Sequence, residues 1–131
     1  MANVLYASAL EAFLKGEIDL INDTIRIALI DTGVVSFSAA HDYFDDVVAG
    51  VIGTPTALAS KTVTGGVFDS ADVSVPSVSG ATVEAAVLYK WSGANATSAL
   101  IEWIDDATGL TLTPNGGDVN ITVPSPGWFA L

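Results

Sequence analysis

The chain has 131 residues, of which half are apolar and 15% are charged, and it contains no cysteine. Its length fits a single domain, its hydrophobicity excludes a disordered chain, and the missing cysteine excludes disulfides, thiolate catalysis and Cys-zinc sites. The formal net charge is −11. The four cations are scattered singly, so nucleic acid and anionic membrane surfaces, which bind clustered Lys and Arg, are not expected as partners. They are Lys15, Arg26, Lys61 and Lys90.

Residues 1–16 are predicted to form a short N-terminal helix. Four apolar side chains recur at i, i+4, i+7 and i+8 and make one stripe. The stripe consists of Tyr6, Leu10, Phe13 and Leu14. Asn3 is the expected N-cap, and Gly16 is the expected stop. The stripe must dock either on the rest of the domain or on a neighbouring subunit.

Short strands are predicted from residue 24 onward. The segments are rich in β-branched residues and are separated by turns containing Gly, Pro, Asn and Asp. The strands are expected over 24–30, 59–64, 67–75 (bent around 69–72), 82–91, 98–104, 110–113 and 119–123, and residues 128–131 close the chain. Turns are expected at 31–33 and 105–109. A helical turn could form within 38–48, and an irregular connection is expected over 47–58.

This pattern predicts a mainly β fold occupying residues 1–131 as a single domain. No helical segment separates the strands after about residue 50, which argues against a parallel sheet. The continuous apolar run from Ala85 to Tyr89 is typical of a strand buried on both faces. We therefore expect an antiparallel β-sandwich or small barrel, jelly-roll-like, with a short N-terminal α-helix.

The residues that could carry chemistry favour no enzyme. His41 is the sole histidine, and no Gly-x-Ser-x-Gly motif accompanies it, so a surface histidine is favoured over a hydrolase. Three acidic groups could bind calcium but lack EF-hand spacing, which favours capping of turns. They are Asp42 with Asp45 and Asp46, Asp69 with Asp72, and Asp105 with Asp106. The tryptophans Trp91, Trp103 and Trp128 could form a sugar platform, although packing is favoured. We expect no catalytic residue, metal or cofactor.

Several short motifs, taken in order, resemble small virion structural proteins of tailed bacteriophages. They are MANVLY (1–6), EAFL (11–14), GEID (16–19), DTIRIALIDT (23–32), KTVTGG (61–66), ATGL (107–110), TPNGGD (113–118) and FAL (129–131). One departure is Leu20, where the family pattern leads us to expect tryptophan. The resemblance spans nearly the whole chain and supplies no catalytic residues.

The resemblance implies a capsid decoration, or cement, protein made in the host cytoplasm. We expect a homo-oligomer, with a trimer as one option, that binds the major capsid protein or another virion protein. An acidic chain is repelled by packaged DNA, which favours the outer face of the capsid. Contacts are expected from the helix stripe and from Trp128 and Phe129. The alternatives are a tail, neck or fibre component and, from another class, a carbohydrate-binding or hydrolytic domain.

Overall fold

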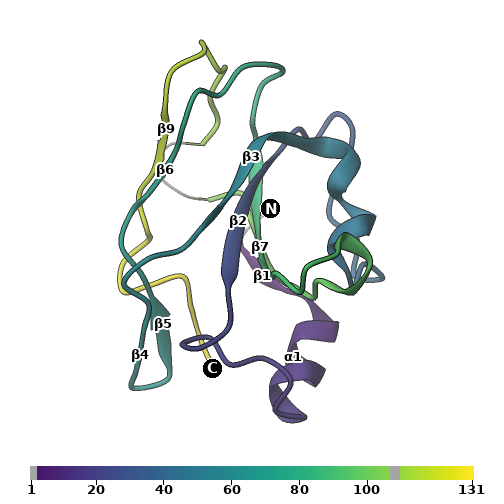
Figure 1. The fold of residues 1–131 in the computed structure, drawn as a ribbon, viewed down its shortest axis with the longest axis vertical. Coiled ribbons are helices and arrows are strands. Elements are labelled where there is room, and N and C mark those ends of the chain that lie inside the picture. The colour runs from purple at the N-terminus through teal and green to yellow at the C-terminus, as the bar shows by residue number, and fades with distance from the viewer. Residues whose placement is uncertain (1–2, 107–109) are drawn as a thin grey trace.

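The computed structural model describes residues 3–106 and 110–131 (Figure 1). Within them the chain is mainly β, with antiparallel strands and one short α-helix, as predicted. The strands are β1 (Val4–Leu5), β2 (Ile25–Ile30), β3 (Val51–Ala57), β4 (Thr62–Thr64), β5 (Val67–Asp69), β6 (Val73–Val75), β7 (Ala85–Lys90), β8 (Leu100–Ile104), β9 (Val119–Ile121) and β10 (Phe129–Ala130). The helix is α1 (Ala7–Leu14), and 3-10 turns cover Phe44–Asp46, Val48–Gly50 and Asn95–Thr97. The turn predicted at 105–109 lies partly outside the described residues.

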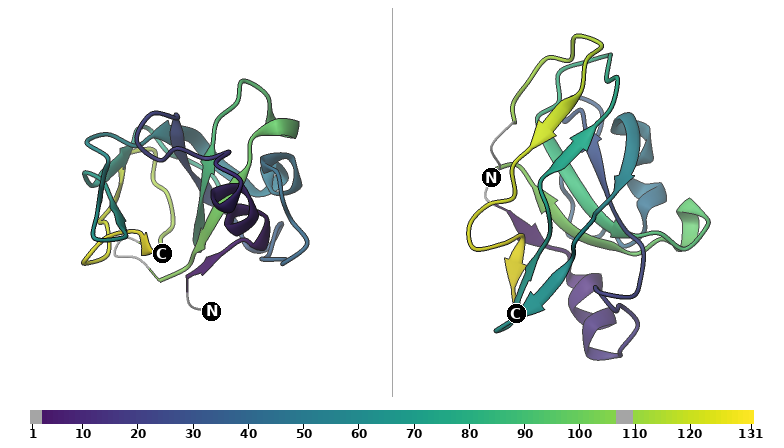
Figure 2. Two further views of the ribbon diagram at one scale, coloured as in Figure 1. Left: turned by 90° about the horizontal axis from the view of Figure 1, so that it is seen from below. Right: turned by 60° about the vertical axis from the view of Figure 1, so that its left-hand side comes forward.

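A five-stranded sheet forms the middle layer, in the order β1-β8-β7-β2-β3. One face carries the three-stranded sheet β10-β5-β4 and the two-stranded sheet β6-β9, as Figure 2 shows. The other face is covered by the 3-10 turns and the loops around them (Figures 1 and 2). The sheets keep open edges in the described part of the chain, so of the two expected architectures the sandwich is the one formed.

The middle sheet is buried on both faces, which confirms the prediction for residues 85–89. Alternate residues of β7 divide between two apolar clusters: Leu88 faces the small sheets, whereas Val87 and Tyr89 face the loops. The ring of Tyr89 stacks on Phe44 of the first 3-10 turn, with ring centroids 4.0 Å apart. A strand with apolar neighbours on both sides cannot alternate with polar residues, and this explains its continuous apolar sequence.

Residues 51–57 correct the prediction of an irregular connection. They form β3, which pairs with β2, and the register shifts between Ile27 and Leu29. The shift accommodates Gly53, which has a φ of +76°, and Pro55, which has no N–H to donate. Both residues are tolerated because β3 is an edge strand of its sheet. The predicted single bent strand over 67–75 is also wrong, because β5 and β6 belong to different sheets.

The start of α1 also differs from the prediction. The helix begins at Ala7 after Tyr6, and Asn3 is not its cap. The carboxamide oxygen of Asn3 instead accepts hydrogen bonds from the backbone N–H groups of Asp105 and Asp106, at 3.1 and 3.0 Å. Residues 4–5 are drawn into the sheet as β1, pairing with β8, and this delays the helix.

One acidic side chain is buried inside the middle sheet. Glu102 of β8 is 3% exposed and lies between Leu5 of β1 and Leu88 of β7 in the register. Its Oε1 has no hydrogen-bond partner. Burial away from water raises the pKa of the Glu102 carboxyl to about 8, because the charged form loses its hydration.

Candidate interaction surface

The six residues predicted to make contacts divide into buried and exposed groups. Tyr6 is fully buried, with its ring centroid 5.3 Å from that of Phe37. Trp128 is 3% exposed, and its indole N–H donates to Ser70 Oγ at 2.8 Å. These two aromatic residues pack within their own chain and present no surface to a partner.

The structure brings Phe13 and Phe129 together. Their ring centroids lie 6.0 Å apart, and Phe129 lies 5.4 Å from Phe68 of β5. This aromatic contact joins α1 to β10 and seats the helix at the end of the sandwich. The other two predicted contacts, Leu10 and Leu14, are 42% and 89% exposed. The side of α1 bearing Leu14 is therefore uncovered in this chain.

An apolar groove of about 440 Å³ lies beside α1, between the loop that follows it and hairpin β4–β5. Its apolar lining includes Phe13 and Leu20, which are half-buried, and Ile21 and Val63, which are 45% and 49% exposed. Figures 1 and 2 place α1 and hairpin β4–β5 at the same end of the molecule. We call this the apolar end and define it by Phe13, Leu14, Leu20, Ile21 and Val63.

The loop carrying Leu20 and Ile21 is held by hydrogen bonds. Gly16, with a φ of +72°, ends α1 as predicted, and its N–H donates to Phe13 O at 3.1 Å. The Asp19 carboxylate then accepts from the backbone N–H of Ile21 and from the backbone and side chain of Asn22, at 2.7–3.1 Å. The Asn22 side chain is the main cause that lowers the pKa of Asp19. The two apolar side chains are thus presented on an ordered turn.

The basic residues gather near this end of an otherwise acidic chain. Lys90 Nζ donates to Glu17 O at 2.7 Å and lies 3.2 Å from an Asp23 carboxylate oxygen. Lys61 Nζ donates to Asp23 O. Lys15 follows α1 directly. Three of the four basic residues therefore lie within or against residues 7–24, where their positive charges offset most of the charge of that segment's four acidic residues.

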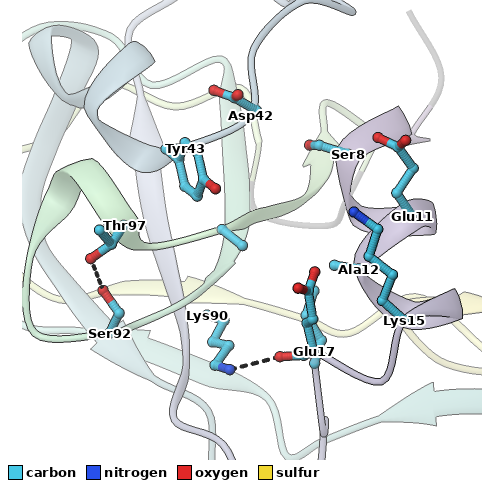
Figure 3. Close-up of a pocket in the computed structure, with 12 residues that line it drawn as sticks. Ser8, Glu11, Ala12, Lys15, Glu17, Asp42, Tyr43, Lys90, Ser92 and Thr97 are labelled. Carbon is cyan, nitrogen blue, oxygen red and sulfur yellow. Dashed lines mark hydrogen bonds between the residues drawn. The ribbon is translucent and has the colours of Figure 1, made fainter.

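A second, polar cleft of about 340 Å³ lies between α1 and the β7–β8 hairpin (Figure 3). Carboxylates and ammonium groups line it, and the hydroxyls of Ser92 and Thr97 lie 2.6 Å apart in a hydrogen bond. The buried hydroxyl of Ser8, which also lines the cleft, has no hydrogen-bond partner. Lys90 is already engaged by Glu17 and Asp23. Lys90, Ser92 and Thr97 are therefore engaged within the chain, whereas Ser8 is not.

Two other candidates for chemistry, His41 and Asp46, lie in or beside the first 3-10 turn. Half-buried His41 lies with Asp46 in a shallow depression, and its Nδ1 has no hydrogen-bond partner. The Asp46 carboxylate accepts from the N–H groups of Asp42 and Tyr43, and the first of these bonds is the main cause that lowers its pKa. Among residues 3–106 and 110–131, no group of three His, Cys, Asp or Glu side chains could hold a metal ion. Through its two hydrogen bonds Asp46 caps a turn, which is the role that the sequence favoured for this acidic group.

Sequence reasoning missed Leu20, Ile21 and Val63. Val63 stands between two threonines before a Gly-Gly turn, which predicts a strand but does not reveal which face is covered. Leu20 and Ile21 precede a strand and carry no periodic signal of their own. Only the approach of hairpin β4–β5 to α1 gives them a shared groove.

Comparisons with known proteins give no family for the chain. Neither a protein-family model nor a curated protein matches it. Within the described residues, there is no helix with the length and hydropathy that crossing a membrane requires.

Proposed function

We propose that this chain is a non-enzymatic structural protein of a tailed-phage virion that decorates the outer face of the capsid. The observation that carries the attachment role is the apolar end, where Leu14 at the end of α1 is 89% exposed. The groove beside α1 adds Ile21 and Val63, which are 45% and 49% exposed. Contiguous exposed apolar side chains are a mark of contact with other proteins. The assignment of the chain to a virion rests on the ordered motifs described under Sequence analysis.

Charge supports the outer face of the shell over its interior. With a net charge of −11, the chain is repelled by packaged DNA. The basic residues near the apolar end reduce the negative charge of the surface that would meet the shell. The rest of the molecule would then face solvent, where acidity favours solubility.

The test is the abundance and position of the chain in purified parent virions. Quantitative mass spectrometry relative to the major capsid protein gives the copy number, and cryo-EM gives the location. Hundreds of copies at capsomer junctions are expected, because a decoration protein follows the shell lattice. About a dozen copies or fewer in a ring would place it in the tail or neck instead, and absence from the particle would refute the proposal.

A rebinding experiment tests the surface itself. Leu14→Asp places a charge on the most exposed apolar side chain of the apolar end, and we expect it to abolish binding of purified protein to particles that lack it. Val34→Asp is the matched control, because Val34 is 59% exposed outside the apolar end. Equal binding by the two variants would remove the apolar end from the attachment role.

A further inference from the structure

We propose that two copies of this chain pair edge to edge along β4, with Val63 of one copy opposite the partner's Val63 across a two-fold axis. The pairing would join two three-stranded sheets into one six-stranded sheet, β10-β5-β4-β4-β5-β10. The pairing rests on the proposed function, because it specifies how the expected homo-oligomer would form. Its test, however, uses purified protein and no virions.

The free edge of β4 has the geometry that such pairing requires. β4 ends the order β10-β5-β4, so β5 is its one neighbour among the described strands. Gly65 and Gly66 form a two-residue turn with φ values of +60° and +80°, flanked by the pair Thr64–Val67. Residues that flank such a turn exchange ladder hydrogen bonds with each other. Val63 lies one residue farther from the turn than Thr64. It therefore directs its N–H and C=O away from β5, to the open side of the sheet.

Other edges of the described sheets carry features that discourage pairing. β3 contains a register shift and Pro55, and β1 and β10 have two residues each. β6 and β9 are flanked by acidic residues and followed by prolines: Asp72, Asp118, Pro76 and Pro124. Natural sheets use bulges, prolines, charges and short strands to block edge association. All three residues of β4 are uncharged, β-branched and exposed.

The apolar groove lies on the face of β4 that pairing would extend. Val63 is directly opposite Phe68 in the register, so their side chains share a face. A two-fold axis perpendicular to the sheet keeps that face common to both copies. Ile21, which lines the groove with Val63, would then face the corresponding groove of the second copy. The contact would remove Val63 and Ile21 from water. It would leave Leu14 of α1 exposed for the attachment to the shell proposed above.

A second copy of the chain fits this edge, because Val63 directs both its N–H and its C=O outward and two identical residues can exchange these bonds across a two-fold axis. Charge favours this edge over the other faces that two copies could share. Two molecules of net charge −11 repel each other, and most faces would set carboxylates against carboxylates. Lys61 directly precedes β4, and Lys15 and Lys90 lie near the same end, offsetting its acidic residues. Self-association is therefore least opposed where the edge and the groove are both open.

Single-cysteine variants test the register directly, because the chain has no cysteine of its own. Residues facing each other in a hydrogen-bonded antiparallel pair have Cα atoms about 5.5 Å apart, within disulfide range. Val63→Cys should therefore yield a disulfide-linked dimer under mild oxidation, read on a non-reducing gel. Thr62→Cys, on the opposite face and off the axis, and Val34→Cys, outside the edge, should remain largely monomeric.

Light scattering and sedimentation measure the non-covalent association. The wild type should show twice its 13.4 kDa chain mass at high concentration, and Val63→Lys should raise the dimer dissociation constant by about tenfold or more. Val34→Lys, with the same charge change, should match the wild type. Circular dichroism identifies any misfolded variant, and Val63→Thr, which keeps the backbone edge, should still dimerise.

Two results would overturn the inference. One is a wild type that stays monomeric at sub-millimolar concentration. The other is a dimer that forms equally in Val63→Lys, or that cross-links as well through residue 34 as through residue 63. Neither result bears on whether the protein is present in virions. Conversely, a dimer of a protein absent from particles would refute the proposed function and leave this interface standing.

Discussion

The buried carboxyl of Glu102 predicts that the protein loses stability as the pH rises from about 4.5 to 8. The native pKa is about 8, against an ordinary value of 4.5 that we assign to the unfolded chain. Between these values the native state keeps a proton that the unfolded state has released. The free energy of unfolding therefore falls with rising pH. The full difference corresponds to about 5 kcal/mol, since one pKa unit is about 1.4 kcal/mol.

Glu102→Gln isolates this effect. The amide has nearly the same shape and cannot ionise, so we expect its stability to resemble that of the wild type at pH 5 and to exceed it by several kcal/mol at pH 8. Urea unfolding at several pH values gives the free energy of unfolding of each protein as a function of pH. Tryptophan fluorescence can follow the unfolding, because Trp103 and Trp128 are buried. Glu11→Gln, an exposed glutamate on α1, is the matched control and should keep the wild-type slope.

The reasoning would be refuted if wild type and Glu102→Gln lost stability in parallel between pH 5 and 8. Parallel curves would mean that the carboxyl is hydrated or paired in the native state. The comparison does not depend on other titrating groups, because these are shared by the two proteins and cancel in the difference.

Three further predictions follow from packing. Phe13→Ala and Phe129→Ala should each lower the free energy of unfolding by about 2–3 kcal/mol, and a double-mutant cycle from urea unfolding should show less than additive losses, because the two rings contact each other. Gly127→Ala should destabilise the fold by about 2–4 kcal/mol, seen as a lower Tm, because the added Cβ would lie 2.5 Å from Phe68 O; an unchanged Tm would contradict this. Leu14→Ser should alter stability by less than about 0.5 kcal/mol, because the side chain is 89% exposed.

Much of the fold could be predicted from the sequence, because its strongest signals are local. The apolar run in β7, the Gly-Gly turn before β5 and the stop at Gly16 each need only neighbouring residues. The β3 strand was missed because Gly53 and Pro55 ordinarily end a strand. Only the position of β3 at a sheet edge, a tertiary property, makes them acceptable.

The interaction surface could be predicted only in part. The sequence predicted the apolar stripe of the helix, but its members differ in exposure: Tyr6 is fully buried and Leu14 is 89% exposed. The spacing of apolar residues cannot distinguish the two. The high apolar content also has an internal explanation, since the middle sheet is covered on both faces and needs two apolar clusters. The case for assembly therefore rests on a few exposed side chains at one end rather than on composition.

The turn at residues 114–117 offers a site where a peptide epitope could be inserted. Figure 1 sets the longest axis of the molecule vertically, with the turn that precedes β9 at the opposite extremity from α1 and hairpin β4–β5. Asn115 and Gly116 in this turn are exposed. A peptide epitope grafted between them would project from the far pole, so it could report on the location of the protein without touching the surface that we assign to binding.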